Sequence, residues 1–198
     1  MSSIEAPFDG HRAVVLPEWI DYNGHMNVAY YLLAFDHASD SFFDALGLDA
    51  AHRDATGGST FAADIHLTYQ REVKEGDPLR ITSQLLGFDD KRLRFFQRMY
   101  HAEEGFLSAT MESLSLYVDL NRRRVTTFPE AIRDRLAAVF AAHRALPLPP
   151  EAGRVIAKPP LPERSPGSSS GAPSGSSPGS SPGPSLGPSS GPSPGPRP

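Results

Sequence analysis

The sequence has no cysteine among its 198 residues, which excludes disulfide bonds, thiolate catalysis and cysteine-ligated metal centres. It also has no stretch that approaches the roughly 20 apolar residues of a membrane-spanning helix, so we expect no membrane segment. The amino-terminal MSSIEAPFDG lacks the basic flank and the apolar run of a secretory signal. The lack of a secretory signal and of a membrane segment predicts a cytoplasmic protein, whereas the lack of cysteine fixes no compartment by itself.

Several motifs that identify enzyme classes are missing as well. There is no His-x-His or His-Glu-x-x-His pattern, no glycine-rich phosphate loop and no Gly-x-Ser-x-Gly elbow. We therefore expect neither a metal site nor a serine nucleophile. Asp and Glu number 23 against 19 Lys and Arg, and this mildly acidic balance argues against a nucleic-acid partner.

The last part of the chain differs in composition from the rest. Residues 165–198 are Ser, Pro and Gly at all but three positions, and such a segment cannot bury enough apolar surface to form a core. Proline enrichment begins near Pro147. We therefore predict one folded domain over residues 1–146, which is long enough to form a core, and a flexible tail over residues 147–198. A linker, a solubilising extension and a dispensable addition are all compatible with this tail.

Apolar periodicity predicts one strand, a long buried helix and then four strands. The first strand is expected over His11–Trp19, and the helix runs from Val28 to Gly47 with apolar side chains at spacings of three and four. A loop near residues 56–59 and a second amphipathic helix, Pro129–Arg144, complete the pattern. The four later strands are expected at Phe61–Gln70, Leu79–Gly87, Arg92–His101 and Phe106–Asp119. Strands grouped after one helix predict an α+β fold, with an antiparallel sheet curved around that helix.

The segment DYNGHMN, residues 21–27, stands between the first strand and the long helix. A helix N-terminus presents unpaired N–H groups and a partial positive charge, so it can bind an oxyanion. A carboxylate just upstream can reach the same carbonyl carbon, and Gly24 lets the backbone turn between them. This placement predicts Asp21 as a nucleophile or general base. Each residue alone also has a structural interpretation: Asp21 as a turn residue, Asn27 as a helix cap and His25 as a surface imidazole.

The run DYNGHMNVAYY, with Asp-x-x-Gly-His-x-Asn ahead of a helix, resembles the active-site motif of hotdog-fold acyl-CoA thioesterases of the 4-hydroxybenzoyl-CoA thioesterase type. The segment HLTYQREVKEGDPLRI, residues 66–81, is similar to that family's segment in which a Tyr precedes basic residues and a Gly-Asp turn. The similarity covers roughly Phe8 to Phe128. The resemblance implies a hotdog fold, in which a curved antiparallel sheet wraps one long central helix.

The resemblance further implies hydrolysis of an acyl-CoA to the free acid and CoA, with no cofactor beyond the CoA thioester itself. Asp21 matches the catalytic carboxylate, acting on water or directly on the thioester. Backbone N–H groups near Asn27 and Val28 match the oxyanion site, and His25 and Asn27 match the other polar residues of the motif. Members of the family form homodimers or homotetramers with active sites at the subunit interface.

The longer stretch from Trp19 to Leu48 is similar to the thioesterases associated with carnitine dehydrogenase, which cleave betainyl-CoA. A quaternary ammonium favours aromatic faces, and aromatic residues gather around the motif, although they are equally compatible with ordinary core and interface packing. His66 could line the acyl pocket or serve as a hydrogen-bonded sheet histidine. The candidate substrate-binding residues are Trp19, Tyr22, Val28, Tyr30, Tyr31 and His66.

Coenzyme A carries phosphates, so its binding surface should supply cations. Basic residues flank the Gly-Asp turn and follow the last predicted strand, although such sets also occur on solvated surfaces. The candidate CoA-binding residues are Arg71, Lys74, Arg122, Arg123 and Arg124. Asp36 and Asp40 lie one turn apart on the long helix and could supply a second carboxylate or form a solvated or interface stripe.

Other functions remain compatible with a hotdog fold. One is a non-catalytic acyl-CoA-binding protein, which the presence of Asp21 at the motif position argues against. Another is a thioesterase for a different short or aromatic acyl-CoA. A hotdog dehydratase would use a His-centred arrangement that DYNGHMN does not show.

Overall fold

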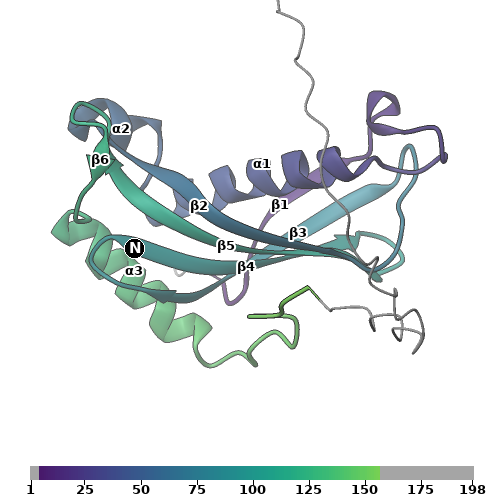
Figure 1. Ribbon diagram of the computed structural model, residues 1–198. Helices are drawn as coiled ribbons and strands as arrows, with labels where there is room; N and C mark the ends of the chain where they lie inside the picture. Colours follow the sequence, from purple (N-terminus) through teal and green to yellow (C-terminus); the bar gives the residue numbers. More distant parts are fainter. Residues whose placement is uncertain (1–4, 157–198) are drawn as a thin grey trace, which may run out of the picture. The chain divides into compact units, whose positions relative to one another are not determined.

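The computed structural model describes residues 5–156 (Figure 1), so most of the predicted tail over residues 147–198 lies outside the described residues. The elements in chain order are β1 (Phe8–Val14), the 3₁₀ helix η1 (Pro17–Trp19), α1 (Val28–Leu46), α2 (Ala50–Thr56), β2 (Gly58–Tyr69), β3 (Pro78–Phe88), β4 (Arg92–His101), β5 (Leu107–Asp119), β6 (Arg124–Val125) and α3 (Glu130–His143). No helix within residues 5–156 is long and apolar enough to cross a membrane.

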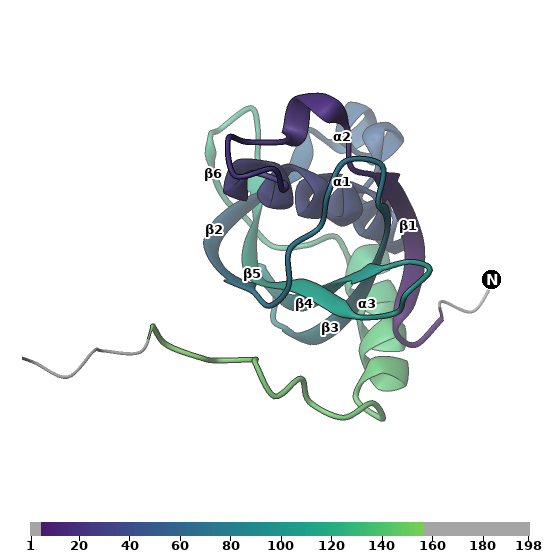
Figure 2. The same cartoon turned by 90° about the vertical axis from the view of Figure 1, so that its right-hand side faces the viewer.

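The strands form one antiparallel sheet that curves around α1. Its order is β1-β3-β4-β5-β2, and the short β6 pairs with the end of β5. Figure 2 shows α1 lying inside the curve of the sheet, while α3 packs against β3. The predicted α+β fold with an antiparallel sheet around a central helix is therefore confirmed. The outermost strands of the main path are β1 and β2.

The limits of α1 follow from local signals in the sequence. The side chain of Asn27 accepts a hydrogen bond from the Ala29 N–H at 3.0 Å, which caps the first turn. Gly47 ends the helix in the left-handed conformation, with φ 81°. The buried face comprises Tyr31, Ala34, Phe35, Ala38, Ser39, Phe42 and Leu46. This apolar face anchors the start of α1 against the sheet, which fixes the position of the DYNGHMN segment.

Several element bounds differ from the predicted ones: β1 begins at Phe8 rather than His11, and the short β6 was not predicted. The first strand ends at Val14 rather than Trp19, because Pro17 cannot donate to a sheet ladder and begins η1 instead. The predicted loop contains α2, whose start is capped by Asp49 and whose end is set by Gly57 in the left-handed conformation. Consequently β2 begins at Gly58, three residues before the predicted Phe61.

The chain beyond α3 lies on the outer face of the sheet. Gly153 donates its N–H to Glu112 Oε2 at 2.6 Å, and Glu112 also pairs with Arg94 on the neighbouring strand. Arg98 and Glu151 approach to 3.5 Å. Residues 147–156 therefore contact β4 and β5 on the side opposite α1.

His143 links α3 to β3 and predicts a pH-dependent stability. Its Nδ1 accepts the Leu85 N–H at 2.8 Å, and Nε2 therefore carries the proton and donates to the Glu5 carbonyl at 3.0 Å. Burial lowers the pKa of His143 below its usual 6.5, although the hydrogen bond to Glu5 opposes this. The unfolded chain therefore binds a proton at this histidine more readily than the folded chain does. The contribution of neutral His143 to the free energy of unfolding is complete above about pH 6.5 and is lost as the pH falls below that value.

We therefore expect the urea concentration at the unfolding midpoint to decrease when the pH is lowered from about 7.5 to about 5.5. His143→Gln should show a shallower fall over the same range. It should not abolish the pH dependence, because burial also lowers the pKa of His11 and contributes with the same sign. Equal slopes for the wild type and His143→Gln would contradict this assignment.

Candidate active site

The predicted catalytic segment folds into a tight hairpin before α1. Ile20 and Met26 form an isolated antiparallel bridge, and within it the Asp21 N–H donates to the His25 carbonyl at 3.1 Å. Gly24 has φ 79° and donates its N–H to the Asp21 carbonyl at 3.0 Å, a turn for which glycine is suited. The Oδ1 atom of Asp21 accepts the Asn23 N–H at 2.8 Å. The loop therefore orients one carboxylate oxygen, and Oδ2 accepts no hydrogen bond from the described residues.

The backbone that leads into α1 has most of its donors engaged. Asn27 N–H donates to the Trp19 carbonyl at 2.8 Å, and Tyr30 N–H donates to the Asn27 carbonyl at 3.0 Å. The Ala29 N–H is capped by the Asn27 side chain. Within residues 5–156, Val28 N–H has no acceptor. Of the two N–H groups expected to bind an oxyanion, the Asn27 N–H is already engaged in closing the hairpin. The Val28 N–H is the one that has no acceptor among the described residues.

A cavity of about 210 Å³ opens beside this helix start. It is lined by His25, Met26, Val28, Tyr31, Tyr69, Gln70, Arg71 and Glu72. The structure thus brings together four of the predicted site residues, from the motif loop, α1 and the segment after β2. The Arg71 guanidinium lies 3.8 Å from the centre of the Phe106 ring and 3.6 Å from the Glu104 carboxylate, so both groups hold this cation at the cavity edge.

The four aromatic residues expected around the substrate do not form one cage. Trp19 is buried and stacks on Tyr30, with ring centres 5.6 Å apart. Tyr31 is buried, which raises the pKa of its hydroxyl, and meets Tyr69 edge-on at 5.2 Å. Tyr22 is 97% exposed at the loop tip. Trp19 and Tyr30 therefore pack against each other, and only Tyr31 of the four lines the 210 Å³ cavity.

The remaining predicted residues lie elsewhere. His66 lies on the outer face of β2 in a cavity with Arg94 and Gly153, whereas Tyr69 on the opposite face meets α1. His66 therefore does not line a pocket on the α1 side of its own chain. Lys74 is exposed and pairs with Glu72 at 3.8 Å.

The three consecutive arginines lie far from the motif loop. All three are exposed: Arg122 and Arg123 lie in the turn between β5 and β6, and Arg124 is the first residue of β6. Figure 1 shows β6 and α2 at one end of α1 and the hairpin before α1 at the other. Within one chain, therefore, these cations do not approach Asp21.

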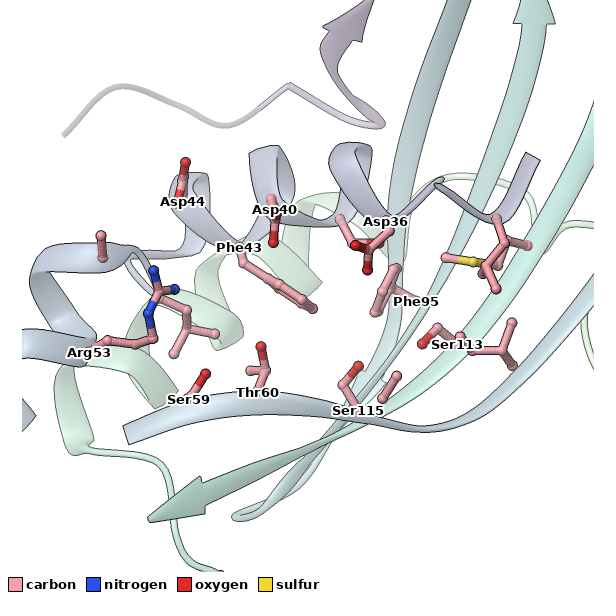
Figure 3. Close-up of a pocket in the computed structure, with 17 residues that line it drawn as sticks. Asp36, Asp40, Phe43, Asp44, Arg53, Ser59, Thr60, Phe95, Ser113 and Ser115 are labelled. Atoms are coloured by element: carbon pink, nitrogen blue, oxygen red, sulfur yellow. The ribbon is translucent and has the colours of Figure 1, made fainter. Parts of the chain in front are cut away.

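A second cavity, of about 340 Å³, lies between α1 and the strands β2 and β5 (Figure 3). Asp36, Asp40, Asp44 and Phe43 line it from α1, and the serines Ser113 and Ser115 line it from β5. Burial raises the pKa of Asp40, and the neighbouring carboxylates of Asp36 and Asp44 raise it further. Asp36 and Asp40 were predicted as candidate residues, whereas neither serine was. The spacing of two between the serines along β5 is the signal that they share its inner face.

An apolar strip runs beside this cavity along the outer edge of the sheet. It consists of large side chains on α1 and β2 that are partly or largely exposed: Val28, Leu32, Ile65 and Tyr69. β2 is the terminal strand of the sheet order and has 12 residues. Long exposed edge strands with apolar side chains mark interaction surfaces.

Comparison with known proteins agrees with these features. The family model of the thioesterase-like superfamily matches residues 15–136. A betainyl-CoA thioesterase of Pseudomonas aeruginosa is 44% identical over 151 residues, which are 76% of this chain and 95% of that protein. An L-carnitine dehydrogenase/betainyl-CoA thioesterase of Agrobacterium fabrum is 38% identical over 159 residues, 80% of this chain but 32% of that protein.

A solved structure supports the same assignment. A hypothetical protein of Staphylococcus aureus in complex with CoA has 28% sequence identity and a TM-score of 0.72, and the match covers 80% of this chain and 100% of that chain. The chain therefore belongs to the thioesterase-like superfamily, with the hotdog fold and the acyl-CoA thioesterase activity that its sequence predicts.

Proposed function

We propose that this thioesterase hydrolyses betainyl-CoA to betaine and CoA as a step in carnitine degradation. The observation that carries the proposal is the similarity to a relative named betainyl-CoA thioesterase. The match covers 95% of the length of that relative at 44% identity. The longer relatives that combine this activity with L-carnitine dehydrogenase in their names support the metabolic setting. In this proposal residues 1–146 are the catalytic domain, and the tail over residues 147–198 supplies no catalytic group.

In the proposed reaction Asp21 attacks the thioester carbonyl or takes a proton from the attacking water. The Val28 N–H, which has no acceptor within residues 5–156 and sits at the positive end of the α1 dipole, binds the oxyanion that forms. The C–S bond then breaks and CoA leaves as a thiolate. If water attacked, the free acid is released directly; if Asp21 attacked, the acyl group remains on Asp21 as a mixed anhydride, which water then hydrolyses to the acid and the free carboxylate. His25 and Asn27 position the loop and the helix start, since Asn27 caps α1 and His25 accepts the Asp21 N–H through its carbonyl.

We further propose that the enzyme is a homodimer, or a homotetramer built from such dimers, with active sites between subunits. The uncovered β2 edge and its apolar strip support a twofold contact in which β2 pairs antiparallel with β2 of a second copy. This pairing would set the two α1 helices antiparallel. The start of one α1 would then lie beside the later turns of the other.

The proposed pairing also accounts for the distribution of the cations. Arg71 and Lys74 lie at the motif end of each chain, whereas Arg122 to Arg124 lie at the opposite end. An antiparallel dimer would bring the arginines of the second copy toward the motif of the first. Both sets could then contact the phosphates of one bound CoA.

The proposal is tested by measuring thiol release from a panel of acyl-CoAs that includes betainyl-CoA, acetyl-CoA and an aromatic acyl-CoA. Because the chain has no cysteine, a thiol reagent reports only the CoA product. We expect kcat/KM for betainyl-CoA to exceed that for the neutral acyl-CoAs by about tenfold or more. Preference for an aromatic or neutral short acyl group would overturn the substrate assignment. CoA binding by folded protein without thiol release from any substrate would instead favour a non-catalytic acyl-CoA-binding protein.

A further inference from the structure

The 340 Å³ cavity between α1 and β2 has an excess of negative charge. Asp36, Asp40 and Asp44 line it from successive turns of α1, and Arg53 is the one basic residue of its lining. Within residues 5–156, none of these three carboxylates forms an ion pair or a side-chain hydrogen bond. Figure 3 shows Asp36 and Asp40 extending from α1 toward the strands. A group that enters the cavity therefore meets unpaired carboxylates.

Two serine hydroxyls from β5 face the same space. Ser113 and Ser115 are each 2% exposed, and neither hydroxyl is hydrogen-bonded to any of the described residues. In Figure 3 both serine oxygens point from β5 into the cavity. Within residues 5–156 neither serine oxygen is a buried atom that lacks a partner, so both oxygens are open to the cavity and can contact a group that enters it. The methyl groups of a quaternary ammonium carry a partial positive charge, and they could contact both oxygens through weak C–H···O interactions.

Aromatic rings complete the lining. Phe43 of α1 and Phe95 of β4 both line the cavity, and they meet edge-on with ring centres 5.6 Å apart. Figure 3 shows both rings between the helix and the strands, next to Asp36 and Asp40. Aromatic faces attract cations through the ring quadrupole, and they do so without requiring a hydrogen-bond donor.

We infer that this cavity is the acyl subsite and that it selects an acyl group carrying a quaternary ammonium, with Asp36, Asp40 and Phe43 as its specificity-determining residues. The inference rests on the proposed function. A quaternary ammonium has no N–H to donate, so it matches a site made of carboxylates, ring faces and hydroxyl oxygens. An anionic acyl group would be repelled, and a neutral one would leave the carboxylates uncompensated. The raised pKa of Asp40 agrees, since burial and its neighbours make its negative charge costly without a cation.

The position of the cavity means that it serves Asp21 of a second copy. In a betainyl thioester one methylene separates the ammonium from the carbonyl carbon, so the ammonium must sit close to the catalytic carboxylate. Asp36 and Asp40 lie two to three turns beyond Val28, roughly 12 to 18 Å along α1 at about 1.5 Å per residue. This distance is too long for one methylene to bridge, so the motif and the cavity of the same chain cannot bind one substrate molecule together. The proposed antiparallel pairing of α1 helices closes this distance, with the carbonyl at one subunit's motif and the ammonium in the other subunit's cavity.

The test compares two substrates of nearly the same shape in the full-length enzyme. In 3,3-dimethylbutanoyl-CoA a carbon replaces the nitrogen of betainyl-CoA, so the pair differs in charge alone. We expect the wild type to favour betainyl-CoA over this isostere by about tenfold or more in kcat/KM. The double variant Asp36→Asn/Asp40→Asn should lower that ratio about tenfold or more. Asp64→Asn removes a carboxylate from the opposite face of β2 and should leave the ratio at its wild-type value.

A second variant covers the case in which the double variant does not fold, which thermal unfolding would reveal. Phe43→Leu keeps an apolar side chain but removes the ring, and it should lower the ratio several-fold. A wild-type preference for betainyl-CoA that survives in both cavity variants would overturn the subsite while leaving the proposed function in place. A wild type that favours the neutral isostere would overturn the proposed substrate itself.

Discussion

Asp21→Asn is expected to lower kcat/KM for every acyl-CoA substrate by about 10²- to 10⁴-fold. The amide has nearly the same shape as the carboxylate, and its Oδ1 can still accept the Asn23 N–H that holds the loop at 2.8 Å in the wild type. It cannot attack a thioester or accept a proton from water. The loss should therefore appear in kcat, as measured by thiol release under saturating substrate, with an unchanged melting temperature.

Two matched variants control this measurement. Asp64→Asn makes the same chemical change on the outer face of β2 and should retain wild-type kcat. Asp21→Glu keeps the charge but moves it by one methylene, so the decrease in kcat of this variant reports how strongly catalysis depends on the position of the carboxylate. An Asp21→Asn enzyme with full activity would remove Asp21 from the mechanism, while the family assignment would stand.

The hairpin before α1 shows why this part of the site was predictable. Its position depends on signals that are local in the chain: Gly24 at the turn, Asn27 as the cap and the apolar spacing that starts the helix. These signals act within about two turns of one another, so the sequence predicts both the start of α1 and the carboxylate ahead of it. The strands that follow were predictable for the same reason, since period-two alternation is local.

The features that the sequence did not predict arise from packing between distant segments. Trp19 and Tyr30 both flank the motif, but their stacking removes them from the substrate side, and no local pattern reveals that contact. The acidic cavity joins Asp36 of α1 with Ser113 of β5, and the packing of α1 on the inner face of the sheet brings the two residues together. The sequence did not predict α2, although Asp49 caps its start and Gly57 ends it, because a seven-residue helix has too few turns for a clear apolar stripe.

The distribution of candidate residues over both ends of α1 points to a site that one chain does not complete. Asp21 and Arg71 lie at one end, while Asp40 and Arg122 to Arg124 lie toward the other. Sequence periodicity describes one chain and carries no signal for the axis that relates two copies. The pairing proposed across the β2 edge would supply that relation, because it would unite the two ends.

Charging the β2 edge is therefore expected to remove both assembly and activity. Ile65 is 38% exposed near the middle of β2 and belongs to the apolar strip, so a lysine at this position would place a charge among the apolar side chains of the proposed contact. We expect Ile65→Lys to be monomeric by light scattering and to lose activity by about a hundredfold or more, with Asp21 and Val28 intact in each chain. Asp64→Lys charges the adjacent residue on the outer face and should keep the wild-type oligomer and activity.

Ile65 also lines the 340 Å³ cavity, so the loss of activity needs a control of its own. Ile65→Ala shortens the same side chain without charging the edge and should remain oligomeric. An Ile65→Lys protein that is monomeric yet fully active would show that each chain holds a complete site. An Ile65→Lys protein that stays oligomeric would place the subunit contact elsewhere.

Mixed oligomers test the shared site directly. Asp21→Asn lacks the catalytic carboxylate, and Asp36→Asn/Asp40→Asn lacks the ammonium subsite, so each alone should hydrolyse betainyl-CoA poorly. In a heterodimer of the two, one of the two sites combines intact Asp21 from one subunit with intact Asp36 and Asp40 from the other, while the second site carries all the substitutions. Unfolding and refolding the two variants together should therefore restore betainyl-CoA hydrolysis, whereas refolding each alone should not. Because a site confined to one chain gains nothing from mixing, the absence of any recovery in demonstrated heterodimers would contradict the arrangement across subunits.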